Sequence, residues 1–216
     1  MALTADLFFS FRSPYSYLAV GRYRQLAEDY AVDIALRPVY PLAIREPDFF
    51  ERNHPNWLRY TMLDMSRVAQ FEGIPFGPPR PDPIVQDVAT RAIAAEQPYI
   101  RRITRLGQAA ARRGKGLAFA AEAARLIWGG AENWHQGDHL AGAASSAGLN
   151  LTELDAEVDR DAEALDAEIA ANQQALEDAG HWGVPTLVFD GEPFFGQDRI
   201  AMAKWRMEQK GLQPRQ

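Results

Sequence analysis

The 216-residue sequence contains no cysteine. This absence excludes disulfides, thiolate metal sites and a cysteine nucleophile, so any thiol chemistry needs a thiol from another molecule. The sequence also lacks an uninterrupted apolar run of the roughly 20 residues that a membrane helix requires. Residues 1–6 carry no positive segment followed by an apolar one, as a secretory signal would. We therefore expect a cytoplasmic protein with no membrane partner.

The sequence also lacks an excess of positive charge, since 23 Lys and Arg stand against 29 Asp and Glu and the formal net charge is −6. Acidic residues gather over residues 152–178, and a local basic run covers residues 101–115. A nucleic-acid interface would need a basic total and a basic run interleaved with aromatics, and the sequence has neither. We expect no nucleic-acid partner. The hydrophobic share of 47% is enough for a substantial globular core.

The first forty residues follow a strand, helix, strand pattern. Residues 6–11 are short, aromatic and nearly all apolar, as in a strand that is buried on both faces. Ser13 can cap a helix with Pro14 at its first position, and helical spacing continues to Tyr30. Alternation over residues 32–39 then predicts a second strand. Together these segments predict a βαβ unit.

Helical periodicity fills the middle of the chain, and strand character returns only near its end. The Asp190-Gly191 turn joins two short apolar runs, which predicts a β-hairpin over residues 185–195. Pro185 stands at the start of a strand, where proline removes no ladder hydrogen bond and a cis peptide is acceptable. We expect helices over residues 58–72, 85–96, 99–113, 117–128, 132–147, from 152 onward, and 198–209.

This order predicts an α/β protein with a thioredoxin-like core, βαβ followed by ββα, split by a large all-helical insertion. Residues 1–41 and 184–216 would form the thioredoxin-like domain, and residues 42–183 the helical insertion subdomain. The segment Ser13-Pro14-Tyr15-Ser16 stands where a redox protein of this fold carries its cysteine pair. An oxidoreductase that uses its own cysteines is therefore excluded.

Three motifs in order carry a family resemblance, over residues 11–17, 183–186 and 195–199. With them the sequence resembles the 2-hydroxychromene-2-carboxylate isomerases, which are similar to kappa-class glutathione transferases and belong with the DsbA-like branch of thioredoxin folds. The resemblance covers nearly the whole length. It implies a glutathione-dependent cis-trans isomerase of aromatic catabolism that interconverts 2-hydroxychromene-2-carboxylate-type and hydroxybenzylidenepyruvate-type compounds. It also implies a small aromatic carboxylate substrate, a homodimer and no metal.

Ser13 is the predicted catalytic residue, and it would also contact glutathione. A free cysteine thiol has a pKa of about 8.5, so a site that uses a thiol must favour the thiolate. A helix N-terminus offers unpaired N–H groups and partial positive charge, and a hydroxyl there can donate to sulfur. The alternative is a plain N-cap without chemistry. The absence of cysteine and the two later motifs favour the functional interpretation.

The remaining glutathione contacts are predicted around the last two strands. The backbone of Val184, beside Pro185, can hydrogen-bond an extended cysteinyl unit, although the Val184 side chain can equally pack in the core. Amides near Gln197 can hold the γ-glutamyl carboxylate and Asp198 its ammonium group, with helix capping as the alternative for Asp198. Within the matching motif the resemblance adds two further residues of the glutathione site, Phe195 and Gly196.

Substrate contacts are predicted after the second strand, where the family often has an Asn and a Lys shortly before a Tyr. Asn53 matches, but residues 1–114 contain no lysine. Arg59 is the candidate positive charge, with a different geometry from an ammonium group. Trp182 is a candidate wall of the substrate cleft or else a packed aromatic.

Two alternative functions remain open. The missing lysine weakens the isomerase relative to a kappa-like glutathione S-transferase, which would release the conjugate. A non-catalytic DsbA-branch peptide-binding module is the third possibility, and the Gln197-Asp198 pair disfavours it.

His135 and His139 have the i, i+4 spacing of metal ligands. The intervening Gly137 and the lack of a third ligand argue against a metal.

Overall fold

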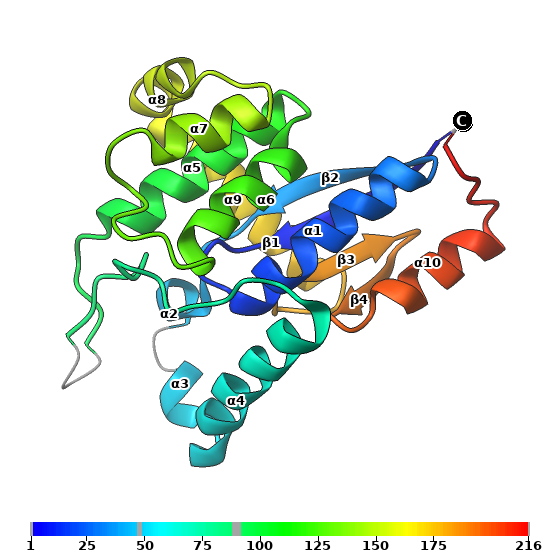
Figure 1. Cartoon of the computed structure of the whole chain (residues 1–216), viewed down its shortest axis with the longest axis horizontal. Coiled ribbons are helices and arrows are strands. Elements are labelled where there is room, and N and C mark those ends of the chain that lie inside the picture. Colours follow the sequence, from blue (N-terminus) through cyan, green and yellow to red (C-terminus); the bar gives the residue numbers. More distant parts are fainter. Residues whose placement is uncertain (1, 47–48, 88–91, 216) are drawn as a thin grey trace.

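The computed structural model describes residues 2–46, 49–87 and 92–215. At its centre is a mixed four-stranded sheet in the order β2-β1-β3-β4 (Figure 1). β1 runs parallel to β2 and antiparallel to β3, which in turn pairs antiparallel with β4. This arrangement confirms the predicted α/β class and thioredoxin-like core. The strands are β1 (Leu3–Phe9), β2 (Val32–Pro38), β3 (Thr186–Phe189) and β4 (Glu192–Phe195).

The core helices begin and end close to where the sequence places them. α1 (Pro14–Asp29) connects the two parallel strands, with Ser13 as its N-cap. The hairpin is confirmed, because Asp190 and Gly191 both have positive φ, at 52° and 77°, as a tight strand connection requires. α10 (Ile200–Gln209) packs against α1, β3 and β4. It begins two residues later than predicted, which leaves residues 196–199 as a loop at the edge of the sheet.

A helical insertion between β2 and β3 is also confirmed. α5, α6 and α9 contact β2, while α4 extends away from the sheet (Figure 1). Every helix in the described part of the chain is too short or too polar to span a bilayer. The insertion helices are α2 (Leu42–Arg45), α3 (Phe49–Arg52), α4 (Pro55–Glu72), α5 (Pro98–Arg112), α6 (Gly116–Trp128), α7 (His139–Ser146), α8 (Leu151–Arg160) and α9 (Ala162–Asp178).

The predicted helix over residues 85–96 is wrong for the part that the structure describes. Gln86 and Ile93 instead form an antiparallel bridge. The Gln97 side chain holds this loop, since its Oε1 accepts from the Val85 amide at 2.9 Å and its Nε2 donates to the Val85 carbonyl at 2.8 Å. A buried side-chain amide therefore satisfies backbone groups that a helix would have paired internally.

The predicted helix over residues 132–147 is right only in its second half. α7 begins at His139, and the preceding residues form turns in which Asn133 and Gly137 have φ of 50° and 56°. Left-handed residues interrupt the helical hydrogen-bond ladder. The stretch from residue 152 onward forms two helices instead of one, and they meet at Asp161.

The hydrophobic core runs continuously through the sheet and the insertion. Phe11, after β1, packs edge-on against Phe119 of α6, and the Trp128 indole donates to the Phe11 carbonyl at 3.0 Å. Gly107 of α5 lies so near the Phe11 ring that a Cβ would sit 2.6 Å from it. Because the two predicted domains share this core, the boundaries at residues 41/42 and 183/184 stay a prediction.

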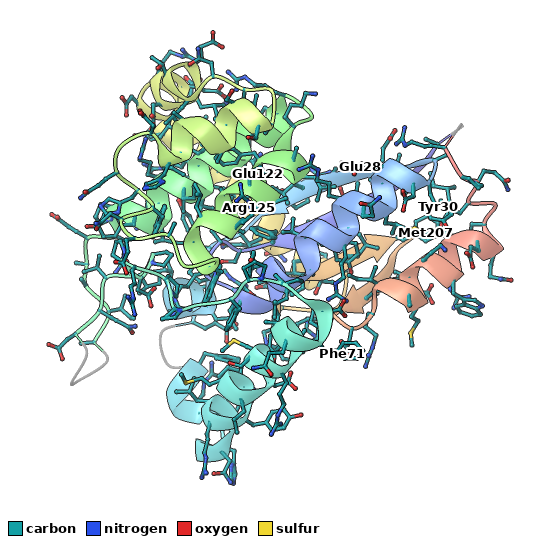
Figure 2. All side chains as sticks on the ribbon, viewed as in Figure 1. Glu28, Tyr30, Phe71, Glu122, Arg125 and Met207 are labelled. Carbon is teal, nitrogen blue, oxygen red and sulfur yellow. The ribbon has the colours of Figure 1, made fainter. Side chains whose placement is uncertain are left out.

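Side chains also join α1 to the insertion on the protein surface. Arg24 of α1 pairs with Glu28 on its own helix and with Glu122 of α6, at 2.8 and 3.0 Å. Figure 2 labels Glu28 and Glu122 on these neighbouring helices.

Phe71 of α4, labelled in the same view, is 89% exposed. Among the described residues, the most exposed large apolar side chain is thus on α4.

Candidate functional site

Ser13 contacts both its own helix and a distant loop. Its Oγ accepts a hydrogen bond from the Ser16 amide at 3.2 Å, which is the N-cap interaction. The same oxygen donates to the Val184 carbonyl at 3.3 Å, across 171 positions of sequence. Ser13 therefore caps the helix and also lies beside the Val184-Pro185 loop, as the functional interpretation requires.

The first turn of α1 presents one free amide. Pro14 has no N–H, the Ser16 amide bonds to Ser13 Oγ, and the Tyr17 amide bonds to the Ser13 carbonyl at 3.1 Å. Within the residues that the structure describes, this leaves the Tyr15 amide without a partner. An unpaired N–H at the positive end of a helix favours an anion such as a thiolate.

The loop before β3 has the predicted backbone geometry. The Val184-Pro185 peptide is cis, and the Pro185 carbonyl accepts from the Gly196 amide at 2.9 Å. The Val184 amide has no partner among residues 2–46, 49–87 and 92–215, whereas its carbonyl accepts from Ser13. Of these two backbone groups, the carbonyl is therefore engaged by Ser13, whereas the amide is available to a ligand. The Val184 side chain packs beside Phe8, so the packing alternative holds as well.

The loop between β4 and α10 brings Gly196, Gln197 and Asp198 to the same end of the sheet. Gly196 has φ of 107°, and a Cβ there would lie 2.6 Å from the Asp198 carboxylate. The positive φ favours glycine here, whereas the exposed Asp198 side chain could move away from a Cβ. Asp198 is exposed and pairs with Arg199 at 2.5 Å. Arg199 is the N-cap residue of α10, so helix capping by Asp198 is not observed.

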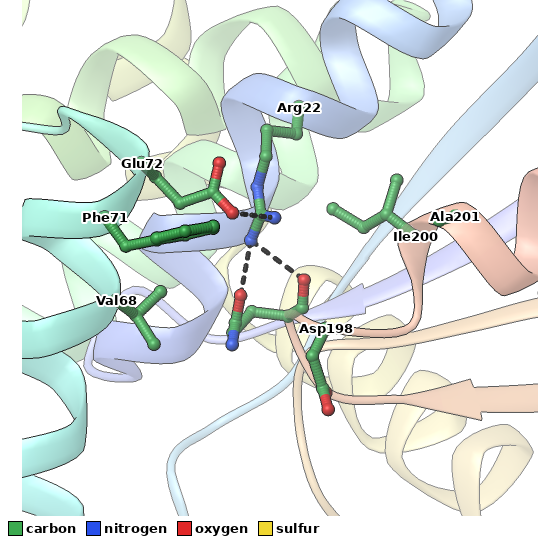
Figure 3. A pocket seen from close by; sticks show the side chains of 8 residues that line it. Arg22, Val68, Phe71, Glu72, Asp198, Ile200 and Ala201 are labelled. Atoms are coloured by element: carbon green, nitrogen blue, oxygen red, sulfur yellow. Dashed lines mark hydrogen bonds and ion pairs between the residues drawn. The ribbon is translucent and has the colours of Figure 1, made fainter.

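A pocket of about 270 Å³ lies beside this loop, between α1, α4 and the start of α10 (Figure 3). Its apolar lining comes from both α4 and the start of α10, and its polar lining from α1, the end of α4 and the loop. The pocket brings together Gln197 and Asp198 with two residues that sequence reasoning missed, Arg22 and Glu72. Helical spacing places Arg22 on α1 but gives no sign of what it faces. The full lining is Arg22, Val68, Phe71, Glu72, Gln197, Asp198, Ile200 and Ala201.

Tyr15 is a second residue near the site that the sequence did not single out. Its hydroxyl donates to Asp64 of α4 at 2.7 Å. Burial and the Asp64 carboxylate raise the Tyr15 pKa well above its usual range, so the phenol stays protonated. Tyr15 therefore fastens α4 to the first turn of α1 rather than acting as an acid.

Three aromatic rings form a stack beside the cis-proline loop, which we call the aromatic stack. His181 lies between Trp182 and Phe195, with ring centroids 4.6 and 4.0 Å away. The Gly183 amide donates to His181 Nδ1 at 2.9 Å, and burial lowers the His181 pKa. Trp182 is 50% exposed and Phe195 45% exposed. The aromatic stack thus presents open ring faces to solvent.

Of the predicted substrate residues, Asn53 lies between α3 and α4, and Arg59 lies on α4. Asn53 donates its side-chain amide to the Phe49 carbonyl at 2.5 Å, and Arg59 is exposed on α4. No contact among the described residues joins either of them to Ser13 or Val184. Trp182 is better placed, because it precedes the cis-proline loop directly and its carbonyl accepts from Arg45 at 2.9 Å.

The sheet order, the cap at Ser13 and the cis-proline loop define a protein of the thioredoxin fold without redox cysteines. The sequence matches the DSBA-like thioredoxin domain family over residues 4–208, so the chain belongs to that family. No curated protein sequence matches the chain.

Solved structures similar to this chain include a 2-hydroxychromene-2-carboxylate isomerase, with 23% identity and a TM-score of 0.70, covering 96% of this chain and 95% of its own. The cytosolic disulfide reductase DsbM from Pseudomonas aeruginosa matches at 21% identity and a TM-score of 0.64, covering 96% of this chain and all of its own. DsbM with GSH matches at 21% identity and a TM-score of 0.63, covering 95% and 100%. At these identities the similarity establishes the fold.

Proposed function

We propose that this protein is a glutathione-dependent cis-trans isomerase of 2-hydroxychromene-2-carboxylate-type and hydroxybenzylidenepyruvate-type aromatic compounds. The observation that supports this best is the contact between the Ser13 hydroxyl and the Val184 carbonyl at 3.3 Å, in a chain without cysteine. A similar structure is itself a 2-hydroxychromene-2-carboxylate isomerase, and another was solved with GSH.

The residues at the site fit glutathione. The free Val184 amide and its carbonyl suit the backbone of an extended cysteinyl unit. The Ser13 hydroxyl and the unpaired Tyr15 amide both lie at the positive end of α1, where a sulfur anion is favoured. The exposed Asp198 carboxylate can pair with an ammonium group.

The bound thiol supplies a nucleophile that adds reversibly to the conjugated substrate, so that a bond can rotate before the thiol leaves. The Ser13 hydroxyl would rotate from the Val184 carbonyl towards the sulfur and donate to it there. This exchange is easy because 3.3 Å is beyond the usual range for an O–H donor. Ser13 Oγ keeps its bond from the Ser16 amide, so the helix cap persists. Each unit by which the site lowers the pKa of the glutathione thiol corresponds to about 1.4 kcal/mol of preference for the thiolate.

The aromatic stack and Arg59 are the proposed substrate contacts. Trp182 and Phe195 each present an exposed ring that can stack on a planar substrate. Arg59 of α4 is an exposed cation that suits a carboxylate, and Asn53, whose amide group is held by Phe49, would act through its remaining oxygen.

A spectrophotometric screen of chromene and benzylidenepyruvate substrates, with and without glutathione, tests the proposal. We expect interconversion only when glutathione is present. Turnover without thiol would overturn the mechanism. A calorimetric titration with millimolar glutathione that shows no heat and no saturation would remove both glutathione-dependent functions and leave the peptide-binding module.

A kappa-like glutathione S-transferase is the second candidate, favoured by the absence of lysine from residues 1–114, where the isomerase family often has one. It differs in the fate of the adduct, which would be released instead of losing its sulfur. Mass spectrometry of the reaction mixture separates the two. Accumulation of a glutathione conjugate identifies a transferase, whereas a mass unchanged from the substrate identifies an isomerase.

A further inference from the structure

Arg22 joins three segments at the edge of the proposed glutathione site. Its Nη2 donates to both the main-chain carbonyl and the side-chain Oε1 of Gln197, at 2.8 and 2.6 Å. Its Nη1 donates to Glu72 of α4 at 2.9 Å, and its Nε to the Leu18 carbonyl at 3.1 Å. Figure 3 shows the bonds to Gln197 and Glu72 meeting at the guanidinium beside the pocket. The Arg22 side chain is only 28% exposed.

The loop that Arg22 holds has few other attachments. Gly196 has no side chain, and α10 begins without a side-chain cap. Among the described residues, the main-chain bonds of the loop run from the Gly196 amide to the Pro185 carbonyl at 2.9 Å, from the Arg199 amide to the Gly196 carbonyl at 3.4 Å, and from the Ala203 amide to the Arg199 carbonyl at 2.8 Å. None of these bonds holds the Gln197 side chain. Its position therefore depends on Arg22.

Arg22 also decides which end of the Gln197 amide faces outward. A guanidinium only donates hydrogen bonds, so the Gln197 oxygen must face Arg22. The Gln197 Nε2 group, which is a donor, is then left for a ligand. Beside it, Asp198 offers an exposed carboxylate that only accepts. A donor next to an acceptor matches the carboxylate and ammonium of an α-amino acid.

We propose that Arg22 is a positioning residue that makes the loop of Gln197 and Asp198 selective for the α-amino-acid end of a γ-glutamyl thiol. The inference rests on the proposed function, since it concerns the same glutathione site. Arg22 does not touch the ligand itself but fixes the group that does. A lysine could not replace it, because an ammonium lacks the planar fork that reaches Gln197 and Glu72 together.

The test compares glutathione with cysteinylglycine, which is the same thiol without its γ-glutamyl group. Calorimetry gives the ratio of the two dissociation constants. We expect Arg22→Met to weaken glutathione binding about tenfold, as for one charge-assisted hydrogen bond, and to leave cysteinylglycine binding within about twofold. Arg22→Lys should resemble Arg22→Met. Arg24→Met is the matched control, because Arg24 lies on the same helix but pairs with Glu28 and Glu122.

Gln197→Leu keeps the test decisive if Arg22→Met does not fold, since this loop residue supports no core packing. It should show the same selective loss. Equal weakening of both ligands in Arg22→Met would make Arg22 a general structural residue and overturn the inference. Unchanged affinity for both ligands would overturn it as well. A wild-type protein that binds no glutathione would instead overturn the proposed function. The two failures are thus distinguishable.

Discussion

The Ser13 oxygen has two roles that would ordinarily belong to two groups. It accepts from the Ser16 amide to cap α1, and it donates to the Val184 carbonyl in the cis-proline loop. A cap of this kind contributes about 1 kcal/mol to stability. Because the acceptor and donor sides of a hydroxyl are independent, stabilising the helix does not prevent Ser13 from donating to a thiolate.

Ser13→Ala should separate these roles. We expect turnover to fall about a hundredfold, as when one donor to a developing charge is lost, with a smaller loss of glutathione affinity. Unfolding free energy should drop by about 1 kcal/mol through the lost cap. Thiolate absorbance of bound glutathione, followed against pH, should show a raised thiol pKa in the variant.

Ser16→Ala is the matched control for that experiment. The Ser16 hydroxyl is buried and has no hydrogen-bond partner among the described residues, so its removal should change stability little. An equal loss of turnover in Ser16→Ala would mean that the defect arises from a disturbed helix terminus and not from the Ser13 hydroxyl.

His181 should make stability depend on pH. Burial lowers its pKa in the folded protein below the unfolded value of about 6.5. The folded state then binds fewer protons, so the contribution is present above about pH 6.5 and is lost as pH falls through the folded pKa. In His181→Phe, which keeps a ring in the aromatic stack, urea unfolding should vary less between about pH 6.5 and 5.

Part of the dependence would remain, because burial also lowers the pKa of His135. A wild-type slope in His181→Phe would contradict the argument.

At the scale of elements, α4 is held to the protein by polar contacts rather than by packing. Among its described side chains only Ala69 is buried. Tyr15 donates to Asp64 near the middle of the helix, and Arg22 pairs with Glu72 at its end. A helix with so few buried apolar contacts belongs to the part of a fold that opens locally before the whole unfolds.

Tyr15→Phe should loosen α4 without unfolding the core. Removing this hydroxyl costs about 1 kcal/mol, and the cost should fall on the docking of the helix. Hydrogen exchange followed by mass spectrometry should show faster exchange in α4, with exchange in β1 and α1 unchanged. Tyr60→Phe is the control on α4 itself, since Tyr60 is 61% exposed. Equal acceleration in the two variants would contradict a specific role for the bond to Asp64.

The elements also show where local sequence rules succeed and fail. α1, α5 and α6 form as predicted because their apolar periodicity agrees with their packing, and Ser13 also caps α1. The described residues of this predicted helix, 85–87 and 92–96, are not helical, because the buried Gln97 amide bonds to Val85 from outside the segment. Helical spacing of apolar residues cannot reveal such a partner, so the periodicity over residues 85–96 was misleading.

At the scale of the whole molecule, the homodimer stays a prediction, and α4 is where it is best tested. Its exposed apolar side chains are more than a surface helix needs. We expect sedimentation to give twice the chain mass, and Met62→Glu to shift it to the monomer. Met202→Glu on α10, a residue of similar exposure, should leave the dimer intact. A monomeric wild-type protein would contradict the prediction. The side chains are Trp57, Leu58, Tyr60, Met62, Leu63 and Phe71.

The sequence by itself determined the order of the core strands and the helix start at Ser13. Buried strands, the Ser13-Pro14 helix start and the Asp190-Gly191 turn follow from short-range rules that need no knowledge of the rest of the chain. The absence of cysteine likewise required any thiol to come from outside.

The tertiary structure decided which of these residues meet. The contacts from Ser13 to Val184, from Arg22 to Gln197 and from Tyr15 to Asp64 join positions 171, 175 and 49 residues apart. Helical periodicity tells which side chains share a face, but the partner of that face depends on how helices and sheet pack together. The supports of the site therefore became visible only once α1, α4 and the loop before α10 were placed against one another.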